Sequence, residues 1–281
     1  MSDQLQKEKI KILELLERFK FLTPRQIALF LSLLEKENFS SMLEEKLISA
    51  IQIPFVIPGQ DDGSVFCLAR KGAEVLALYN QKPVEEIKYI TPSKQKRSLL
   101  FLEHTICLNE FVLVMEKLSD AGIRILQFEG EPKGIFPNVF VRSAKGVECL
   151  SLIPDAVFKI EFEGKEHLFL VEIDRGTMSL ARMRQKFRAY VDLWKDGFME
   201  KKFNLKNLRV MVVCSGERRV KSFIEEVRKI GTGMGLFWFT GQENITLNQP
   251  ERFLGNIWRT AKNEKCRLFN KKTKSEDVFT L

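Results

Sequence analysis

The stretch from Pro154 to Asp174 reads PDAVFKIEFEGKEHLFLVEID and decides how the second half of the chain folds. Two apolar runs flank Glu163-Gly164, a dipeptide of the kind that closes a tight turn between strands. The stretch therefore predicts a β-hairpin with strands over residues 156–162 and 167–173.

Three carboxylates fall at one end of this predicted hairpin. Side chains alternate along a strand, so Glu172 and Asp174 project from one face, and Asp155 stands at the start of the neighbouring strand. Clustered carboxylates repel one another unless a cation neutralises them, and hard oxygen ligands suit Mg²⁺ or Mn²⁺. Lys186 lies on the helix predicted over 177–194, from which its side chain can point back at the cluster and stabilise phosphate charge.

Two interpretations of this cluster remain open. The first is a metal-dependent phosphodiesterase centre, in which Asp155, Glu172 and Asp174 would be the metal ligands. The second is an ion-pair network in which Asp155 caps a turn while Glu172 and Asp174 pair with the cations that follow them, which are Arg175, Arg182 and Lys186.

Around the hairpin, helices and strands alternate. This order predicts an α/β (α+β) domain with a mixed sheet flanked by helices. The expected elements besides the hairpin and helix 177–194 are a helix over 98–118, a strand over 123–128, a strand over 208–214, a helix over 217–230 and a strand over 236–239.

The first 80 residues predict three short helices followed by a hairpin. Thr23-Pro24 is an N-cap followed by proline at the first helical position, which is a strong helix start. Strands are expected over 51–57 and 65–69, with a turn at 60–63. This order of elements is that of a winged helix-turn-helix.

The helix that would enter a DNA groove carries little positive charge. Glu35, Glu37, Glu44 and Glu45 crowd it, against two basic residues, Lys36 and Lys46. Groove-reading helices usually present Arg, Lys, Asn or Gln to the bases. DNA reading and a role in dimerisation or protein contact therefore both remain open for this helix.

Composition divides the chain into four parts. Residues 1–80 form the expected winged helix-turn-helix, and residues 81–97 form a polar linker with two prolines. Residues 98–245 form the sheet domain, and residues 246–281 are expected to be a basic C-terminal tail.

Charge points to a polyanionic partner for the second half. Residues 1–95 hold 13 basic and 13 acidic side chains, which leaves 32 basic and 24 acidic side chains for the rest. An excess of this kind attracts nucleic acid first. The side chains expected to contact DNA are Arg182, Arg184, Arg188, Lys201, Lys202, Arg218 and Arg219.

Several other classes of protein are excluded. The five cysteines are scattered without a CxxC pair, and there are two histidines, so neither a disulfide framework nor a zinc site is expected. The run Gly231–Gly235 lacks the Lys-Ser/Thr of a nucleotide-binding loop, so ATP hydrolysis is not expected. The polar N-terminus and the short apolar runs predict a cytoplasmic protein without membrane contact.

Three segments of the chain resemble the replication-relaxation family of plasmids and conjugative elements. The segments PDAVF and VEIDRGTMSLARMRQKFRAYVDLW are similar to the family's PDA segment, its acidic-x-Asp-Arg-Gly-Thr run and its helix with Lys and Tyr four residues apart. The helix EHTICLNEFV is similar to the family's His-Thr helix. The matching positions are Pro154, Asp155, Ala156, Glu172, Asp174, Arg175, Gly176, Thr177, Lys186 and Tyr190, together with His104, Thr105, Asn109 and Glu110.

The resemblance implies a winged helix joined to a domain similar to PD-(D/E)xK nucleases. It further implies a DNA-binding accessory protein acting in plasmid replication, relaxation or mobilisation, with relaxase or replication proteins as partners. The chain departs from the nuclease pattern because Asp174 stands where that pattern has lysine, and Lys186 would have to replace it. Cleavage is therefore expected to be weak or absent, with DNA binding intact.

Two other functions remain open beside this one. The first is a metal-dependent DNA endonuclease that uses Asp155, Glu172, Asp174 and Lys186 with Mg²⁺ or Mn²⁺. The second is a winged-helix transcription regulator. A homodimer is a further expectation, and Tyr190 is expected to serve packing rather than to act as a nucleophile.

Overall fold

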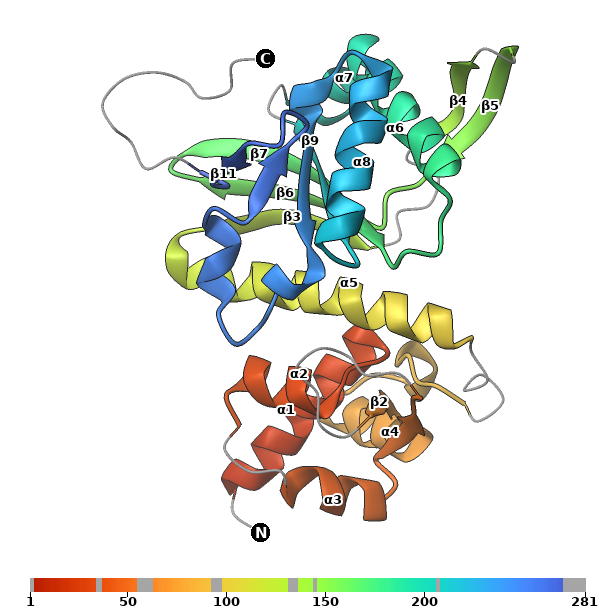
Figure 1. Cartoon of the computed structure of the whole chain (residues 1–281). Coiled ribbons are helices and arrows are strands. Elements are labelled where there is room, and N and C mark those ends of the chain that lie inside the picture. Colours follow the sequence, from red (N-terminus) through yellow and green to blue (C-terminus); the bar gives the residue numbers. More distant parts are fainter. Residues whose placement is uncertain are drawn as a thin grey trace. The chain divides into compact units, whose positions relative to one another are not determined.

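A computed structural model describes residues 3–33, 37–54, 63–91, 98–130, 136–143, 146–205 and 208–269 of the chain (Figure 1). The chain divides into two compact units, residues 1–113 and 114–281. The division falls inside helix α5 (Leu99–Lys117) and not in the linker expected at 81–97.

The first unit begins with three short helices, followed by a two-stranded antiparallel sheet and a further helix. This is the order predicted for a winged helix-turn-helix, an assignment that stays a prediction. The first strand begins at Ile48 rather than at Ile51, two residues after Lys46, whose left-handed backbone ends the helical turn. The end of the predicted first strand, residues 55–57, and residues 60–62 of the predicted turn lie outside the described residues. The elements are α1 (Asp3–Phe19), α2 (Pro24–Leu31), α3 (Glu37–Glu44), β1 (Ile48–Gln52), β2 (Ser64–Leu68) and α4 (Arg70–Tyr79).

Helix α2 begins where the sequence predicts it. The Thr23 hydroxyl accepts a hydrogen bond from the Gln26 backbone amide at 3.1 Å, and the Gln26 side chain accepts one from the Thr23 amide at 3.1 Å. This reciprocal capping box satisfies two amides that have no partner inside the helix. The N-cap prediction is confirmed.

The second unit is built on a mixed seven-stranded sheet, which confirms the predicted α/β class. The strand order is β11-β10-β9-β8-β7-β6-β3, with β7, β8 and β9 parallel and the other neighbours antiparallel. The predicted hairpin is confirmed, and Glu163 and Gly164 both adopt positive φ in its turn. The strands are β3 (Arg124–Gly130), β6 (Ala156–Phe162), β7 (Lys165–Asp174), β8 (Leu208–Cys214), β9 (Phe237–Gly241), β10 (Trp258–Thr260) and β11 (Lys265–Cys266).

Two parts of this unit differ from the expectation. A separate antiparallel hairpin, β4 (Phe136–Ser143) and β5 (Gly146–Leu152), stands where no strands were expected. The segment predicted as a basic tail instead contributes β10 and β11 to the sheet. Its Trp258 is fully buried and the indole donates to the Phe253 carbonyl at 2.9 Å, which anchors the segment in the unit. Residues 270–281 lie outside the described part of the chain.

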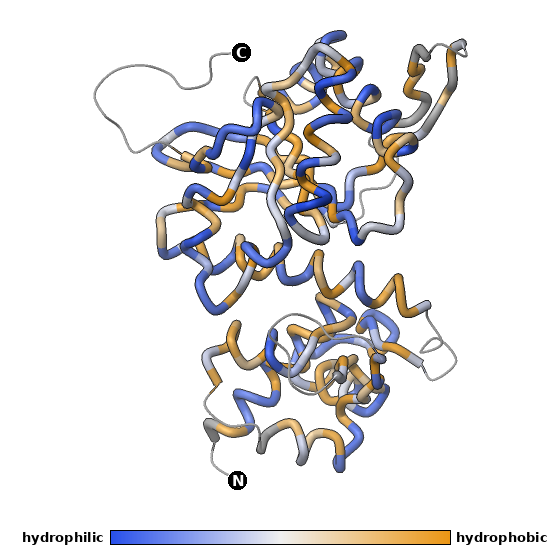
Figure 2. Tube along the Cα trace, in the orientation of Figure 1, coloured by the Kyte–Doolittle hydropathy of each residue, from blue (hydrophilic) through white to orange (hydrophobic). Residues whose placement is uncertain are grey.

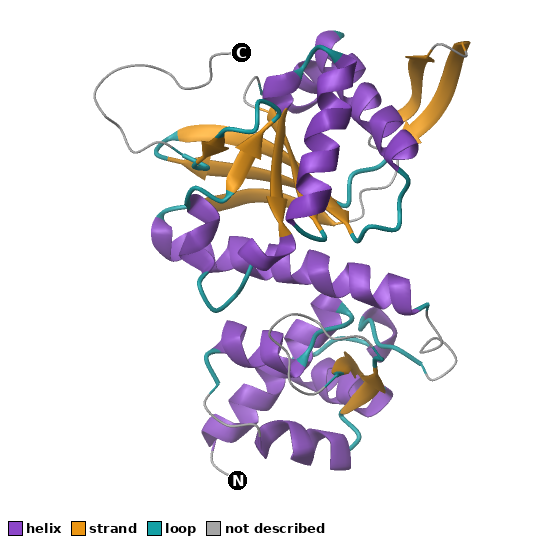
Figure 3. Ribbon diagram, viewed as in Figure 1, coloured by secondary structure: helices purple, strands orange, loops and turns teal. Residues whose placement is uncertain are grey.

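Helices α6 (Leu180–Lys195) and α8 (Glu217–Ile230) lie against one face of the sheet, and α7 (Phe198–Phe203) follows α6 (Figure 3). Apolar residues follow the strands, whereas polar and apolar residues alternate along α8 (Figure 2). Phe187 and Phe223 from these helices pack in one core with Leu170 and Val212 from the strands. Within the described ranges, no helix has the length and apolarity that crossing a membrane requires.

In the first unit, helix α5 closes the end of α1. The Asn109 side-chain amide donates to the carbonyl oxygens of Phe19 at 3.1 Å and Phe21 at 2.7 Å. Phe19 ends α1 and its carbonyl also accepts from the Phe21 backbone amide at 2.7 Å, whereas the Phe21 carbonyl lies beyond the helix. Asn109 is buried, so water does not replace it there.

Replacing Asn109 should test this attachment. Asn109→Ala leaves the Phe21 carbonyl without this donor and the Phe19 carbonyl with the Phe21 amide alone, and we expect the free energy of unfolding to fall by about 2 kcal/mol. Asn109→Asp keeps the shape but places acceptors against acceptors, so we expect a loss at least as large. Urea unfolding of the full chain measures both, and an unchanged midpoint in both variants would contradict the assignment.

Candidate functional site

The site begins with two buried carboxylates on strand β7. Glu172 and Asp174 are two residues apart, so they project from the same face of the sheet, on which α6 and α8 pack. Both are almost completely buried, with 3% and 7% of their surfaces exposed. A buried carboxylate is costly unless a cation or hydrogen-bond donors compensate for its charge.

Helix α6 compensates Glu172. Lys186 and Tyr190 are one helical turn apart and therefore share one face of α6. The Lys186 ammonium lies 2.5 Å from Oε2 of Glu172, and the Tyr190 hydroxyl donates to Oε1. Both oxygens of the carboxylate are occupied by groups of the protein.

Helix α8 compensates Asp174. The Arg219 guanidinium donates from Nε to Oδ2 at 2.7 Å and from Nη2 to Oδ1 at 3.1 Å, which is the bidentate geometry of a strong Arg–carboxylate pair. The guanidinium also donates to the Met178 carbonyl and lies 4.3 Å from the centre of the Phe223 ring. Arg219 thus holds the loop between β7 and α6 in place.

Asp155 lies beside Glu172, at the start of strand β6. Because Ala156 pairs with Val171, Asp155 stands at the register position opposite Glu172. Its carboxylate accepts a hydrogen bond from the Ile173 backbone amide at 2.7 Å. The structure therefore brings Asp155, Glu172 and Lys186 together, as predicted, while Asp174 belongs to a separate ion pair.

This arrangement does not fit a bound metal ion. The carboxylate oxygens of Glu172 and Asp174 face Lys186, Tyr190 and Arg219, whose hydrogens would have to be displaced. Over the ranges that the structure describes, no three or more His, Cys, Asp or Glu side chains form a group that could hold a metal. The geometry matches the ion-pair interpretation of the sequence more closely than the metal interpretation.

Burial dominates the protonation of Glu172. It raises the pKa of this carboxyl to about 7; the Lys186 charge opposes the shift, the Asp155 charge adds to it, and the hydrogen bonds from Lys186 and Tyr190 also oppose it. Burial acts to lower the pKa of Lys186, but the charges of Glu172 and Asp155 outweigh it, so that pKa is raised. The pKa of Tyr190 is also raised, by burial first and then by Glu172, which keeps its hydroxyl a donor.

The other predicted residues differ in their partners and in their exposure. Arg184 pairs with Glu226, Arg175 donates to Gln242, and Lys202 lies over the Phe136 ring at 5.4 Å, so these cations have partners within the unit. Arg188 is half-buried. The exposed members are Arg182, Arg218, Lys201, Lys202 and Thr177.

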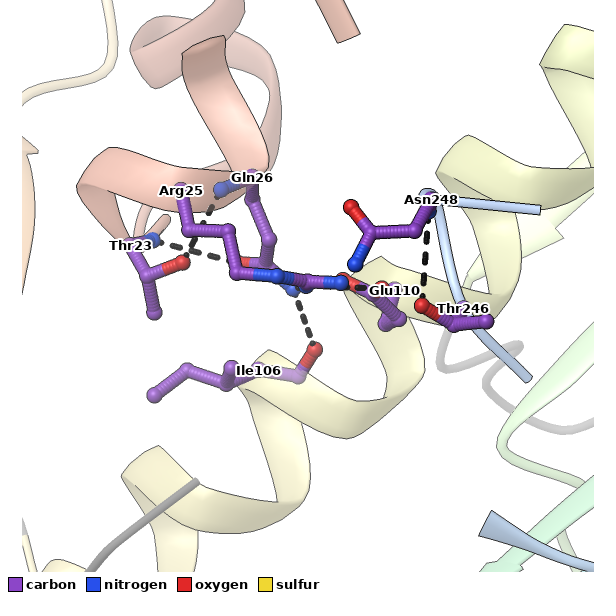
Figure 4. A network of polar contacts seen from close by, with 7 residues as sticks. All are labelled: Thr23, Arg25, Gln26, Ile106, Glu110, Thr246 and Asn248. Atoms are coloured by element: carbon purple, nitrogen blue, oxygen red, sulfur yellow. Dashed lines mark hydrogen bonds and ion pairs between the residues drawn. The ribbon is translucent and has the colours of Figure 1, made fainter. Parts of the chain in front are cut away.

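The family-matching residues of α5 serve packing in the first unit (Figure 4). Glu110 is buried and accepts from Arg25 at 3.1 Å and from the Gln26 side chain at 3.0 Å. Gln26 also donates to the Ile106 carbonyl at 3.0 Å. His104 lies half-buried on the same helix.

Sequence reasoning missed four partners of the buried carboxylates. Tyr190 was assigned to packing, Arg219 was assigned to DNA contact, and Arg25 and Gln26 were not singled out. A signal for Arg219 existed: α8 follows a strand parallel to β7, so its first turn must begin at the edge where Asp174 ends.

The raised pKa of Glu172 makes a pH-dependent prediction. Between about pH 4.5 and about 7, Glu172 is protonated in the folded protein and ionised in the unfolded chain. The free energy of unfolding therefore falls as pH rises through this range. Glu172→Gln cannot titrate and should remove this fall, which amounts to at most about 3 kcal/mol. Urea unfolding at several pH values measures this fall in the free energy of unfolding.

Glu166→Gln, at a carboxyl paired with Lys159, is the control and should keep the wild-type dependence of unfolding free energy on pH. A Glu172→Gln profile parallel to the wild-type profile would contradict the prediction.

The comparisons with known proteins agree with the resemblance in the sequence. A family model described as Replication-relaxation matches residues 13–207, which is more than half of the chain. No curated protein and no solved structure matches the chain significantly. The matched span includes Asp155, Glu172, Lys186 and the packing network of α5, and it connects the chain with replication-related function. The chain belongs to the replication-relaxation family.

Proposed function

We propose that the protein is a DNA-binding accessory protein of a plasmid or conjugative element, acting in replication, relaxation or mobilisation. The observation that carries this proposal is the balance of charge at one edge of the sheet. There the buried carboxylates are compensated inside the unit by Lys186 and Arg219, while further cations are exposed.

This basic edge is where β7 and β8 end. The two strands are parallel, so α6 and α8 both begin at this edge, with Arg182 in the first turn of α6 and Arg218 in the first turn of α8. Both arginines are exposed. Glu217, the acidic residue in the first turn of α8, pairs with Arg259 at 2.8 Å and so adds little net negative charge. The positive ends of two helix dipoles add to the attraction for phosphate.

The first unit suits contact with a protein better than contact with a DNA groove. Helix α3 ends at Glu44, and Glu45 follows it and pairs with Lys9 at 2.5 Å. An acidic helix end repels phosphate and attracts basic surfaces. Relaxase or replication proteins are the partners that the family connection suggests for this unit.

Paired substitutions at the two edges of the sheet test the DNA interface. Removing Arg182 and Arg218 together (Arg182→Ala with Arg218→Ala) should lower affinity for duplex DNA by about tenfold and reduce the slope of log K against log salt by about 2, because each phosphate contact releases about one counterion. Titration of labelled DNA at several salt concentrations measures both quantities.

A charge-matched control uses cations at the opposite edge. Lys165 begins β7 and Lys195 ends α6, and both are exposed. Lys165→Ala with Lys195→Ala removes the same charge and should leave the salt slope within experimental error. Equal losses in the two double variants would mean that net charge, and not this edge, determines binding.

One observation favours a metal-dependent DNA endonuclease as the second candidate. Asp155 and Glu172 stand opposite each other in register with Lys186 beside them, which keeps the set of residue types that phosphodiester cleavage requires. Since both Glu172 oxygens are engaged, we expect no nicking of supercoiled plasmid with Mg²⁺ or Mn²⁺. Metal-dependent nicking by the wild-type chain that disappears in Asp155→Ala and in Lys186→Ala would establish the endonuclease instead.

A further inference from the structure

The end of helix α4 exposes apolar surface that the first unit does not use. Leu78 is 82% exposed, more than any other large hydrophobic side chain in the described ranges, and Tyr79 beside it is 60% exposed. A single exposed leucine is ordinary on a protein surface. A leucine that stands beside an open apolar groove is a feature of interaction surfaces.

Such a groove adjoins Leu78. After α4 the chain turns back, because Gln81 adopts a positive φ and the Lys82 amide donates to the Ala77 carbonyl at 2.9 Å. The returning segment runs along the end of the helix. The groove between them, called here the α4 groove, is lined by Glu74, Ala77, Leu78, Gln81, Lys82, Pro83 and Val84.

The α4 groove is complementary to itself. It presents the exposed Leu78 beside a hollow lined by apolar, polar and charged side chains on one surface, which is what a twofold interface between identical copies needs. Glu74 stands on the helix and Lys82 on the segment that turns back, and both line the groove with opposite charges. A twofold axis through the groove can therefore bring Glu74 of one copy against Lys82 of the other, and the pair is then formed twice.

We infer that two copies of this chain associate through the α4 groove into a homodimer, with Leu78 of each copy seated in the groove of its partner. The charges favour a second copy over nucleic acid, because Glu74, Glu85 and Glu86 are exposed around the groove and would repel phosphate. The exposed contact between Arg70 and Glu74 at 3.1 Å contributes little and does not prevent Glu74 from pairing across the interface.

Sedimentation equilibrium of the full chain over a range of concentrations tests the inference. The wild-type chain should form a dimer, and Leu78→Asp should raise the dissociation constant by at least about a hundredfold, since it places a charge at the centre of the interface. Leu100→Asp is the matched control: Leu100 is 59% exposed but lies outside the groove, and its variant should dimerise like the wild type.

A charge exchange makes the test independent of the apolar contact. Glu74→Lys and Lys82→Glu should each weaken the dimer by about tenfold, because each opposes like charges, whereas the double variant should restore it to within about threefold of the wild type. The circular dichroism spectrum should be the same for all variants. A monomeric wild-type chain, a dimer that survives Leu78→Asp, or a double variant no better than the single variants would overturn the inference.

Discussion

The burial of Glu172 is the constraint on which the second unit depends. A carboxylate at the centre of a sheet demands compensation, and α6 supplies it from two residues one turn apart, Lys186 and Tyr190. This fixes the rotation of α6 about its axis, since only one face of the helix presents both groups to the strand. Arg219 fixes α8 in the same way through Asp174. Two polar anchors thus set the packing of two helices whose remaining contacts are apolar and less directional.

The same principle operates in the first unit with different chemistry. Glu110 is compensated by Arg25 and by the Gln26 amide, and Gln26 also caps its own helix through Thr23. A single glutamine therefore joins the start of α2 to the middle of α5. Asn109 and Glu110, two of the residues by which α5 resembles the family, act as attachment points for this helix.

Local sequence patterns predicted the strands and the helix that hold Glu172 and Lys186. The contacts that were not predicted depend on pairing between segments far apart in the sequence. The apolar runs around Glu163-Gly164 correctly predicted the β6–β7 hairpin, and the helix predicted over 177–194 carries Lys186 to Glu172 as expected. The partner of Asp174 could not be read from spacing, because Arg219 lies 45 residues away and reaches it only through the parallel pairing of β7 with β8. Strand β10 was not predicted, because only a few apolar residues stand there among charged ones. The structure identifies it by the burial of Trp258.

The order of strands also explains how the sheet resists the addition of strands from other molecules. Its outermost strands are β3 and β11, and an unpaired strand edge is a template for aggregation. Strand β11 has only two residues, which offers too little backbone for another chain to pair with. Strand β3 is longer, but its pairing with β6 shifts register between Ile125 and Gln127, and Arg124 stands charged at its start. A bulged, charged edge on one side and a very short edge on the other let seven strands lie together while discouraging an eighth from joining from another molecule.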